Sequence, residues 1–189
     1  MDKPPIYDHH HAVQFYGDDE SLFVTVAGFL SQGLVDGHPA IIIATQDHSD
    51  AILDHLSRRM IDVARARRMR GLVVLDAQET LDQFMDGDHP DPERFEENVG
   101  RLIASLLEGR ENRILIRAYG EMVDVLWKQG RTQAAIRLEI LWNRLAQRYG
   151  FALLCGYSMG NFFKATRGFE DICREHTHVI TPLAEESSI

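Results

Sequence analysis

The 189-residue sequence lacks several features that would assign it to a common functional class. It has two cysteines, Cys155 and Cys173, too few for the disulfide framework of a secreted domain, so we expect a reducing compartment. No apolar run approaches the roughly 20 residues that cross a bilayer, and the N-terminus has no apolar signal core. We therefore expect a cytoplasmic protein without a membrane contact. The net charge of −9 is unfavourable for nucleic-acid binding, which needs clustered Lys and Arg.

The order of the apolar segments favours an α/β fold. Hydrophobic residues make up 44% of the chain and charged residues 26%, as expected for a globular protein with a buried core. Continuous apolar runs, typical of strands covered on both faces, alternate with segments whose apolar residues recur at helical spacing. This alternation predicts a three-layer α/β/α domain, with a mainly parallel sheet of about five strands between helices. The strands are expected at residues 12–16, 41–44, 72–75, 113–119 and 151–157.

The expected domain organisation is simple. Residues 11–182 form a single domain, preceded by an N-terminal extension at residues 1–10 and followed by a flexible tail at residues 183–189. No internal repeat or low-complexity segment divides the sequence further.

A candidate site is expected at one edge of the sheet, because ligands of open parallel sheets bind beyond the carboxyl ends of the strands. His11 lies directly before the first strand, Tyr16 ends that strand, and Tyr157 ends the fifth. The stretch "ILIRAYGEMVDVLW" places Arg117 and Glu121 where the fourth strand turns into a helix. Glu121 also has a structural explanation, since a carboxylate is favoured at a helix start.

Motifs for phosphate or covalent chemistry are missing. The turn after the first strand, "QFYGDDESLF", has one glycine, three acids and no lysine, whereas a phosphate-binding loop needs several glycines and a lysine. "GYSMGNF" lacks the glycine two residues before the serine that a nucleophile elbow requires. Asp76 follows an apolar strand, where a helix-capping role is the common one. The sequence therefore predicts a protein that is not an enzyme.

The longest helical segment, at residues 133–149, places two polar residues in an apolar arc. On a helical wheel, Glu139 and Asn143 fall among buried positions. A buried carboxylate needs a cation or several hydrogen-bond donors, and Arg117 is a candidate partner from an adjacent strand. Two interpretations stay open: an internal ion pair that joins helix to sheet, or the polar wall of a ligand pocket.

Histidines and cysteines raise the question of a metal site. Cys173 and His176 lie three residues apart, and His11 and Cys155 could converge with them in the fold. No recognised metal-binding spacing is present, and Cys155 between Leu154 and Gly156 fits a small buried side chain. We therefore expect no metal and no cofactor.

The ordered set of motifs resembles a known family. "HAVQFYGDDESL", "GLVVLDAQETLDQFM", "IRAYGEMVDVLWKQG", "RLEILWNRLAQRYGFALLCGY" and "ICREHTHVI" are together similar to the MEDS domain, a sensory domain named for methanogens, methylotrophs and the dichloromethane repressor. The resemblance implies a RecA-like fold of the circadian-clock type with a degraded phosphate loop. It also implies a bacterial or archaeal input module for small molecules, proposed to be hydrocarbon derivatives.

The leading hypothesis from the sequence is a non-catalytic sensory module. It binds a small organic ligand and acts on a signalling partner in a histidine-kinase, anti-sigma or transcription-control pathway, or through a homodimer. One alternative is a residual nucleotide-binding protein that uses Asp76 or Glu121 as its acid. The other is a purely structural interaction domain in which Arg117 and Glu139 form an internal brace. The ligand-binding residues expected from motif and position are His11, Tyr16, Arg117, Glu121, Glu139, Asn143, Cys155, Tyr157 and His176.

Overall fold

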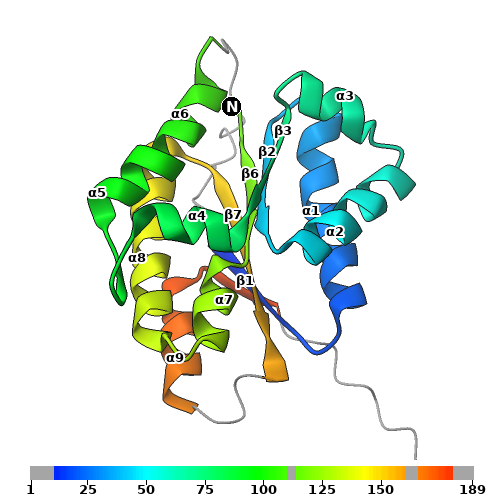
Figure 1. The fold of residues 1–189 in the computed structure, drawn as a ribbon. Helices are drawn as coiled ribbons and strands as arrows, with labels where there is room; N and C mark the ends of the chain where they lie inside the picture. The colour runs from blue at the N-terminus through cyan, green and yellow to red at the C-terminus, as the bar shows by residue number, and fades with distance from the viewer. Residues whose placement is uncertain (1–10, 110–113, 161–165, 181–189) are drawn as a thin grey trace, which may run out of the picture.

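The computed structural model describes residues 11–109, 114–160 and 166–180, and its centre is a six-stranded sheet in the order β3-β2-β6-β7-β1-β8 (Figure 1). Every pair of neighbouring strands in this sheet is parallel. The predicted three-layer α/β/α fold is therefore confirmed. The predicted extension at residues 1–10 and tail at residues 183–189 lie outside the described residues. The strands are β1 (His11–Tyr16), β2 (Ala40–Ala44), β3 (Leu72–Asp76), β6 (Arg117–Gly120), β7 (Ala152–Ser158) and β8 (His178–Ile180).

Helices cover both faces of the sheet, as Figure 1 shows. One layer consists of α1 (Asp19–Val35), α2 (Gln46–Arg58) and α3 (Val63–Arg68). The other layer consists of α4 (Ala77–Phe84), α5 (Pro92–Phe95), α6 (Arg101–Leu107), α7 (Met122–Lys128), α8 (Thr132–Tyr149) and α9 (Thr166–Glu175). A π-helical turn, η1 (Glu96–Gly100), joins α5 to α6, and a small hairpin of β4 (Met85–Asp86) and β5 (His89–Pro90) follows α4.

The alternation of side chains along the strands divides the interior into two cores. In β2, Ile41 and Ile43 pack with the α4–α9 layer, while Ile42 packs with α1 and α2. All five residues of β2 are buried, as expected for a strand covered on both faces. Among the helices of the described residues, none combines the length and the apolar character that crossing a membrane requires.

Acidic residues at strand ends begin three of the helices. The Asp76 side chain accepts a hydrogen bond from the Glu79 N–H and caps α4. Asp18 and Asp91 cap α1 and α5 in the same way. Asp76 therefore has the capping role expected from the sequence.

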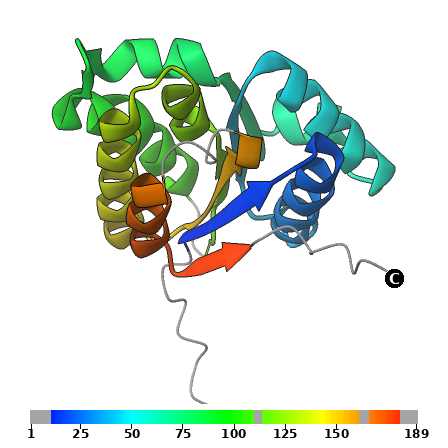
Figure 2. The same cartoon turned by 90° about the horizontal axis from the view of Figure 1, so that it is seen from below.

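The sheet differs from the expectation at two places. The fourth predicted strand began at residue 113, but β6 begins at Arg117, whose register partners Ala40 and Ala152 are also the first residues of their strands. Ile116 is buried just before the strand, where its carbonyl accepts a hydrogen bond from the Ala152 N–H although it has no register partner. The sixth strand, β8, has three exposed residues and extends the open edge beside β1 (Figure 2). It has no apolar run that could have indicated it.

Candidate functional site

The predicted site residues do not form a single pocket but fall into two clusters and one outlier. His11 and Tyr16, for example, stand at opposite ends of β1, about 16 Å apart along the strand. We call the first group the inner cluster; it lies under α8 and α9 and consists of His11, Glu139, Asn143, Cys155, Tyr157 and His176. We call the second group the edge cluster; it lies at the carboxyl ends of the strands and consists of Tyr16, Thr45, His48, Tyr119, Glu121 and Asp124.

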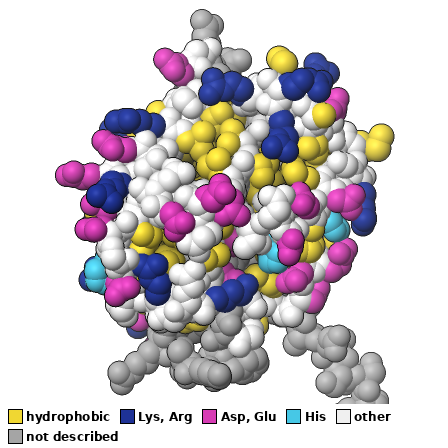
Figure 3. All heavy atoms as spheres, in the orientation of Figure 1, with side chains coloured by type: hydrophobic (Ala, Val, Ile, Leu, Met, Phe, Trp, Pro, Cys, Tyr) yellow, Lys and Arg dark blue, Asp and Glu magenta, His cyan; other side chains and the backbone are white. Residues whose placement is uncertain are grey.

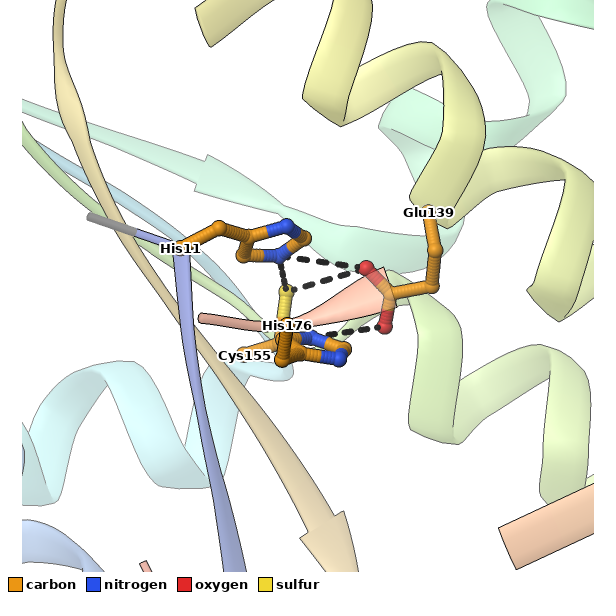
Figure 4. Close-up of side chains that lie close together, drawn as sticks. All are labelled: His11, Glu139, Cys155 and His176. Atoms are coloured by element: carbon orange, nitrogen blue, oxygen red, sulfur yellow. Dashed lines mark hydrogen bonds and ion pairs between the residues drawn. The ribbon is translucent and has the colours of Figure 1, made fainter. Parts of the chain in front are cut away.

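Strand register and helix position create the inner cluster. His11 begins β1, and Cys155 lies in the neighbouring strand β7, two residues beyond the register partner of His11. Side chains two residues apart on a strand share a face, so both point toward α8. Glu139 lies in the middle of α8 and its side chain points toward His11 and Cys155, and His176 directly follows the end of α9 (Figure 4). Figure 4 shows these four side chains pointing toward one another.

The contacts within the inner cluster centre on Glu139, whose exposed fraction is 0%. Its Oε2 lies 3.2 Å from His11 Nε2, and its Oε1 lies 3.4 Å from His176 Nε2. Tyr157 donates a hydrogen bond of 2.8 Å to Oε1, and the Cys155 Sγ lies 3.5 Å from Oε2. A carboxylate removed from water thus has four polar neighbours, which offsets its desolvation.

Electrostatics in the inner cluster favour a charged Glu139. Burial alone would raise the pKa of Glu139, but His176 and His11 outweigh burial and lower that pKa. Burial acts against the charged form of His176, but Glu139 raises the pKa of His176 above its usual value. Burial, and then the charge of Glu139, raise the pKa values of Cys155 and Tyr157. Without another cation, the Cys155 thiol is therefore protonated and is a poor nucleophile.

The edge cluster surrounds Glu121, which follows β6 directly and is 2% exposed. Its carboxylate accepts hydrogen bonds from the Thr45 N–H and, at 3.1 Å, from the Tyr119 hydroxyl. His48 Nδ1, in the first turn of α2, lies 2.7 Å from Glu121 Oε2. The other ring nitrogen of His48 lies 3.9 Å from the exposed carboxylate of Asp19. The His48 side chain, 15% exposed, therefore connects the buried glutamate to the surface.

Asp124 joins a second part of the edge cluster to the sheet. The Tyr16 hydroxyl donates to Asp124 Oδ2 at 3.5 Å, and the Ser158 N–H donates to Oδ1 at 3.0 Å. Lys128 lies 2.7 Å from the same carboxylate, one helical turn further along α7. Burial and the charge of Asp124 raise the pKa of Tyr16, so its hydroxyl stays protonated and acts as a donor.

The contact between Glu121 and His48 lowers the pKa of Glu121 and raises the pKa of His48. Burial would raise the pKa of Glu121, but the hydrogen bond and charge of His48 lower it below its usual value. The hydrogen bond to Glu121 raises the pKa of His48 in spite of partial burial. Around this pair, acidic residues begin both helices, at Asp19 and Glu20 of α1 and at Asp47 of α2. Figure 3 shows acidic and histidine side chains gathered over this region, in the lower right part of the view.

The predicted position and partner of Arg117 were wrong. Arg117 begins β6, so it lies at the amino edge of the sheet, opposite the edge cluster. Its guanidinium donates to the Phe29 carbonyl at 3.0 Å and to the Gln32 side chain at 3.1 Å, and it lies over the Phe29 ring. The aliphatic part of the Arg117 side chain packs so closely against Gly33 that a Cβ added to Gly33 would lie 2.9 Å from Arg117 Cδ. Arg117 therefore joins β6 to α1 and does not neutralise Glu139.

Sequence reasoning missed His48, the side chain that links Glu121 to the surface. The second strand was expected to end at residue 44, and His48 lies four residues beyond that end. Its only signal was its place in the first turn of the following helix. Histidines at such places occur without a function, so the contact with Glu121 became visible only in three dimensions.

A surface cavity of about 500 Å³ lies away from both clusters. It is lined by the end of α1, at Leu34 and Val35, and by the segment around α3, from Met60 to Met69. None of the predicted site residues is among its lining residues in the described part of the chain.

Comparison with known proteins identifies the family. A search of curated proteins found no match. The family model described as the MEthanogen/methylotroph, DcmR Sensory domain matches residues 10–177, a range that contains both clusters. The predicted resemblance is thereby confirmed, and the chain belongs to the MEDS family of sensory domains.

Proposed function

We propose that this protein senses a small organic molecule at the edge cluster and passes the signal to a regulatory partner without catalysing a reaction. The observation that carries the proposal is the buried carboxylate of Glu121, which connects β6, the end of β2 and the start of α2 through His48. A ligand that competes for His48 or Glu121 would change the position of α2 relative to the sheet. Such a ligand favours one conformation by its differential affinity for the two.

The chemistry of the edge cluster favours a particular kind of ligand. Carboxylates and tyrosine side chains lie around His48, and the first turns of α1 and α2 are acidic. A hydroxyl or amine on a short hydrocarbon would donate to Glu121 or Asp19 and pack against Phe23, whose ring lies 5.1 Å from that of His48. The hydrocarbon derivatives implied by the family resemblance include such molecules.

A nucleotide is disfavoured as the ligand. The residues that begin α1, Asp18, Asp19 and Glu20, are all acidic, and the Asp18 side chain already accepts from the Ser21 N–H. A phosphate at this helix start would meet repulsion instead of free N–H donors. This supports the prediction that any ancestral phosphate loop is degraded. We further propose a cytoplasmic location and output through a kinase, an anti-sigma factor, a transcription regulator or a second copy of the chain.

The proposal is tested by thermal unfolding in the presence of short-chain alcohols, amines and carboxylic acids. A ligand at about 100 times its Kd stabilises a protein by about 2.7 kcal/mol, which for a chain of this size raises Tm by about 5–10 °C. We expect at least one alcohol or amine to raise the Tm of the wild type, and Glu121→Gln to abolish that rise.

Arg117→Lys is the matched control, because Arg117 lies at the opposite edge of the sheet. The Arg117→Lys variant should show the same ligand-induced rise in Tm as the wild type, even if its Tm without ligand is lower. An equal rise in the wild type and in Glu121→Gln would show that the edge cluster is not the ligand site. If only Arg117→Lys lost the ligand-induced rise in Tm, the ligand would bind at the amino edge of the sheet and not at the edge cluster.

A further inference from the structure

Four side chains with metal-binding atoms meet under α8, and they come from four separate parts of the fold (Figure 4). His11 begins β1, Cys155 lies in β7, Glu139 lies in α8, and His176 follows α9. One ligand atom from each of these residues lies within 4.8 Å of the other three. The exposed fractions of the His176 and Glu139 side chains are both 0%, so the site is closed to solvent.

The spacing of three of these atoms fits one face of the tetrahedron around a metal ion, and the His176 Nε2 atom lies within 4.8 Å of all three. Bonds of about 2.0–2.3 Å to a central ion place tetrahedral ligand atoms about 3.3–3.8 Å apart. Around Glu139 Oε2, the distance to His11 Nε2 is 3.2 Å and the distance to Cys155 Sγ is 3.5 Å. The third side of this triangle, from His11 Nε2 to Cys155 Sγ, is 3.2 Å. Small movements of these side chains would therefore accommodate an ion at the centre.

The His176 ring is oriented by a contact outside the group. Its Nδ1 lies 2.7 Å from the Ile172 carbonyl oxygen, which can only accept, so Nδ1 carries a proton and donates. The Nε2 atom is then the one that faces Glu139. It is buried and has no hydrogen-bond partner among the described residues. A ring nitrogen directed into a closed group of anionic and thiol ligands is the arrangement that metal-binding histidines show.

His11 is oriented in the same way through Asn143. The Asn143 amide nitrogen donates to the carbonyl and to the side chain of Glu175, at 2.9 and 3.0 Å. The amide orientation is thereby fixed, and its oxygen faces His11 Nδ1 at 2.8 Å. His11 Nδ1 must donate, and His11 Nε2 faces Cys155 and Glu139. In the same group, Tyr157 donates to Oε1 of Glu139, so Oε2 is left directed toward His11 and Cys155.

From this geometry we infer that His11, Glu139, Cys155 and His176 bind one Zn²⁺ ion through two imidazole nitrogens, one carboxylate oxygen and one thiolate. Zinc accepts this mixture of nitrogen, oxygen and sulfur ligands and favours four ligands in a tetrahedron. Binding forms one zinc–sulfur bond and two zinc–nitrogen bonds, and it releases to solvent the Cys155 thiol proton together with any proton held by the two coordinating ring nitrogens. The charge of the dication is then balanced by the thiolate and the carboxylate, so the buried site is neutral overall. This site is independent of the ligand contact proposed at the edge cluster.

The ion would connect the last part of the fold to its centre. The segment after α9 already contacts the start of β1, because the Thr177 N–H and hydroxyl both donate to the His11 carbonyl, at 2.7 and 2.9 Å. Zinc bound by His11 and by the adjacent His176 would strengthen this junction and tie it to β7 and α8. Four protein ligands leave no open position, which is typical of a structural zinc ion.

The test measures zinc content and affinity directly. Tag-free protein is stripped with EDTA, dialysed and titrated with ZnCl₂ against a chelating dye, and bound zinc is counted by mass spectrometry. We expect the wild type to retain one zinc ion per chain. Asn143→Ala, which removes the contact that orients His11 and two hydrogen bonds to Glu175 but no zinc ligand, should weaken zinc binding about 10–100-fold, and Cys155→Ser should weaken it further.

Cys173→Ser is the matched control, because Cys173 is the other free cysteine and lies outside the group. It should bind zinc as the wild type does. With Co²⁺ in place of zinc, thiolate-to-cobalt absorption should appear in the wild type and in Cys173→Ser but not in Cys155→Ser. Well under one retained zinc per wild-type chain overturns the inference even if a variant does not fold. Equal affinity in Cys155→Ser and the wild type overturns it as well.

Discussion

The contact between Glu121 and His48 should make stability depend on pH, and Glu121→Gln removes that dependence. Glutamine keeps the size of the side chain but has no charge. The bonds from Thr45, Tyr119 and His48 to Glu121 therefore change from charge-assisted to neutral. Hydrogen bonds to charged groups contribute about 1.5–3 kcal/mol and neutral ones about 0.5–1.5 kcal/mol. We expect Glu121→Gln to lower the free energy of unfolding by about 1–2 kcal/mol at about pH 5.5.

The pH range follows from the directions of the two pKa shifts. The pKa of His48 is raised from 6.5 in the folded state, so its stabilising effect is complete below pH 6.5 and is lost as pH rises through the folded pKa. The pKa of Glu121 is lowered from 4.5, so its effect is complete above pH 4.5 and is lost as pH falls through the folded pKa. The difference between wild type and Glu121→Gln should therefore be largest between pH 4.5 and 6.5.

Urea denaturation of both proteins at about pH 5.5 and about pH 9 measures this difference. The control is Glu97→Gln, which removes an exposed ion pair with Arg101 and should change stability by less than about 1 kcal/mol at either pH. A destabilisation by Glu121→Gln that is equal at the two pH values would refute the pairing of a charged His48 with a charged Glu121.

Three further predictions test the packing and the nucleotide-binding alternative. Arg117→Ala should lower the free energy of unfolding by about 1–2 kcal/mol in urea, because it removes the bond to the Phe29 carbonyl, yet leave zinc binding unchanged. Gly156→Ala should cost about 1–3 kcal/mol, since the new Cβ would lie 2.8 Å from the Tyr119 hydroxyl, whereas Gly17→Ala, with no atom within 4 Å, should be nearly neutral. Titration calorimetry with Mg-ATP should give no heat of binding, because acidic residues begin α1; micromolar affinity would restore the nucleotide-binding alternative.

The fold was largely predictable because the buried strands contain or directly follow an apolar run. β2, with all residues buried, is the clearest example, and a strand of this kind needs no knowledge of its neighbours to be recognised. β8 was not predictable, since it is the edge strand and its three exposed residues pair only with β1. β8 forms because α9 ends where the following residues can pair with β1, and this position is set by the tertiary structure.

The site was predictable in part, for a similar reason. Glu139 and Asn143 were identified as polar residues on an apolar helix face, and the structure confirms that this face is buried at Glu139. Arg117 was misplaced because a strand boundary was wrong by four residues. In a parallel sheet, such an error places a side chain at the wrong edge of the sheet. Every contact partner inferred from that position is then wrong as well.

Histidine, and not arginine or lysine, faces the carboxylates of both glutamates that are buried among the described residues, Glu121 and Glu139. A purely structural brace is better served by a permanent cation, and the buried Asp124 has one in Lys128. The alternative of an internal Arg117–Glu139 brace also fails, since Arg117 contacts α1 instead. Because histidine changes charge near neutral pH and binds metal ions, protons, metals and small ligands can all alter these two contacts. An interaction whose free energy differs between two states is what a sensory domain requires, and both buried glutamates of this domain have such an interaction.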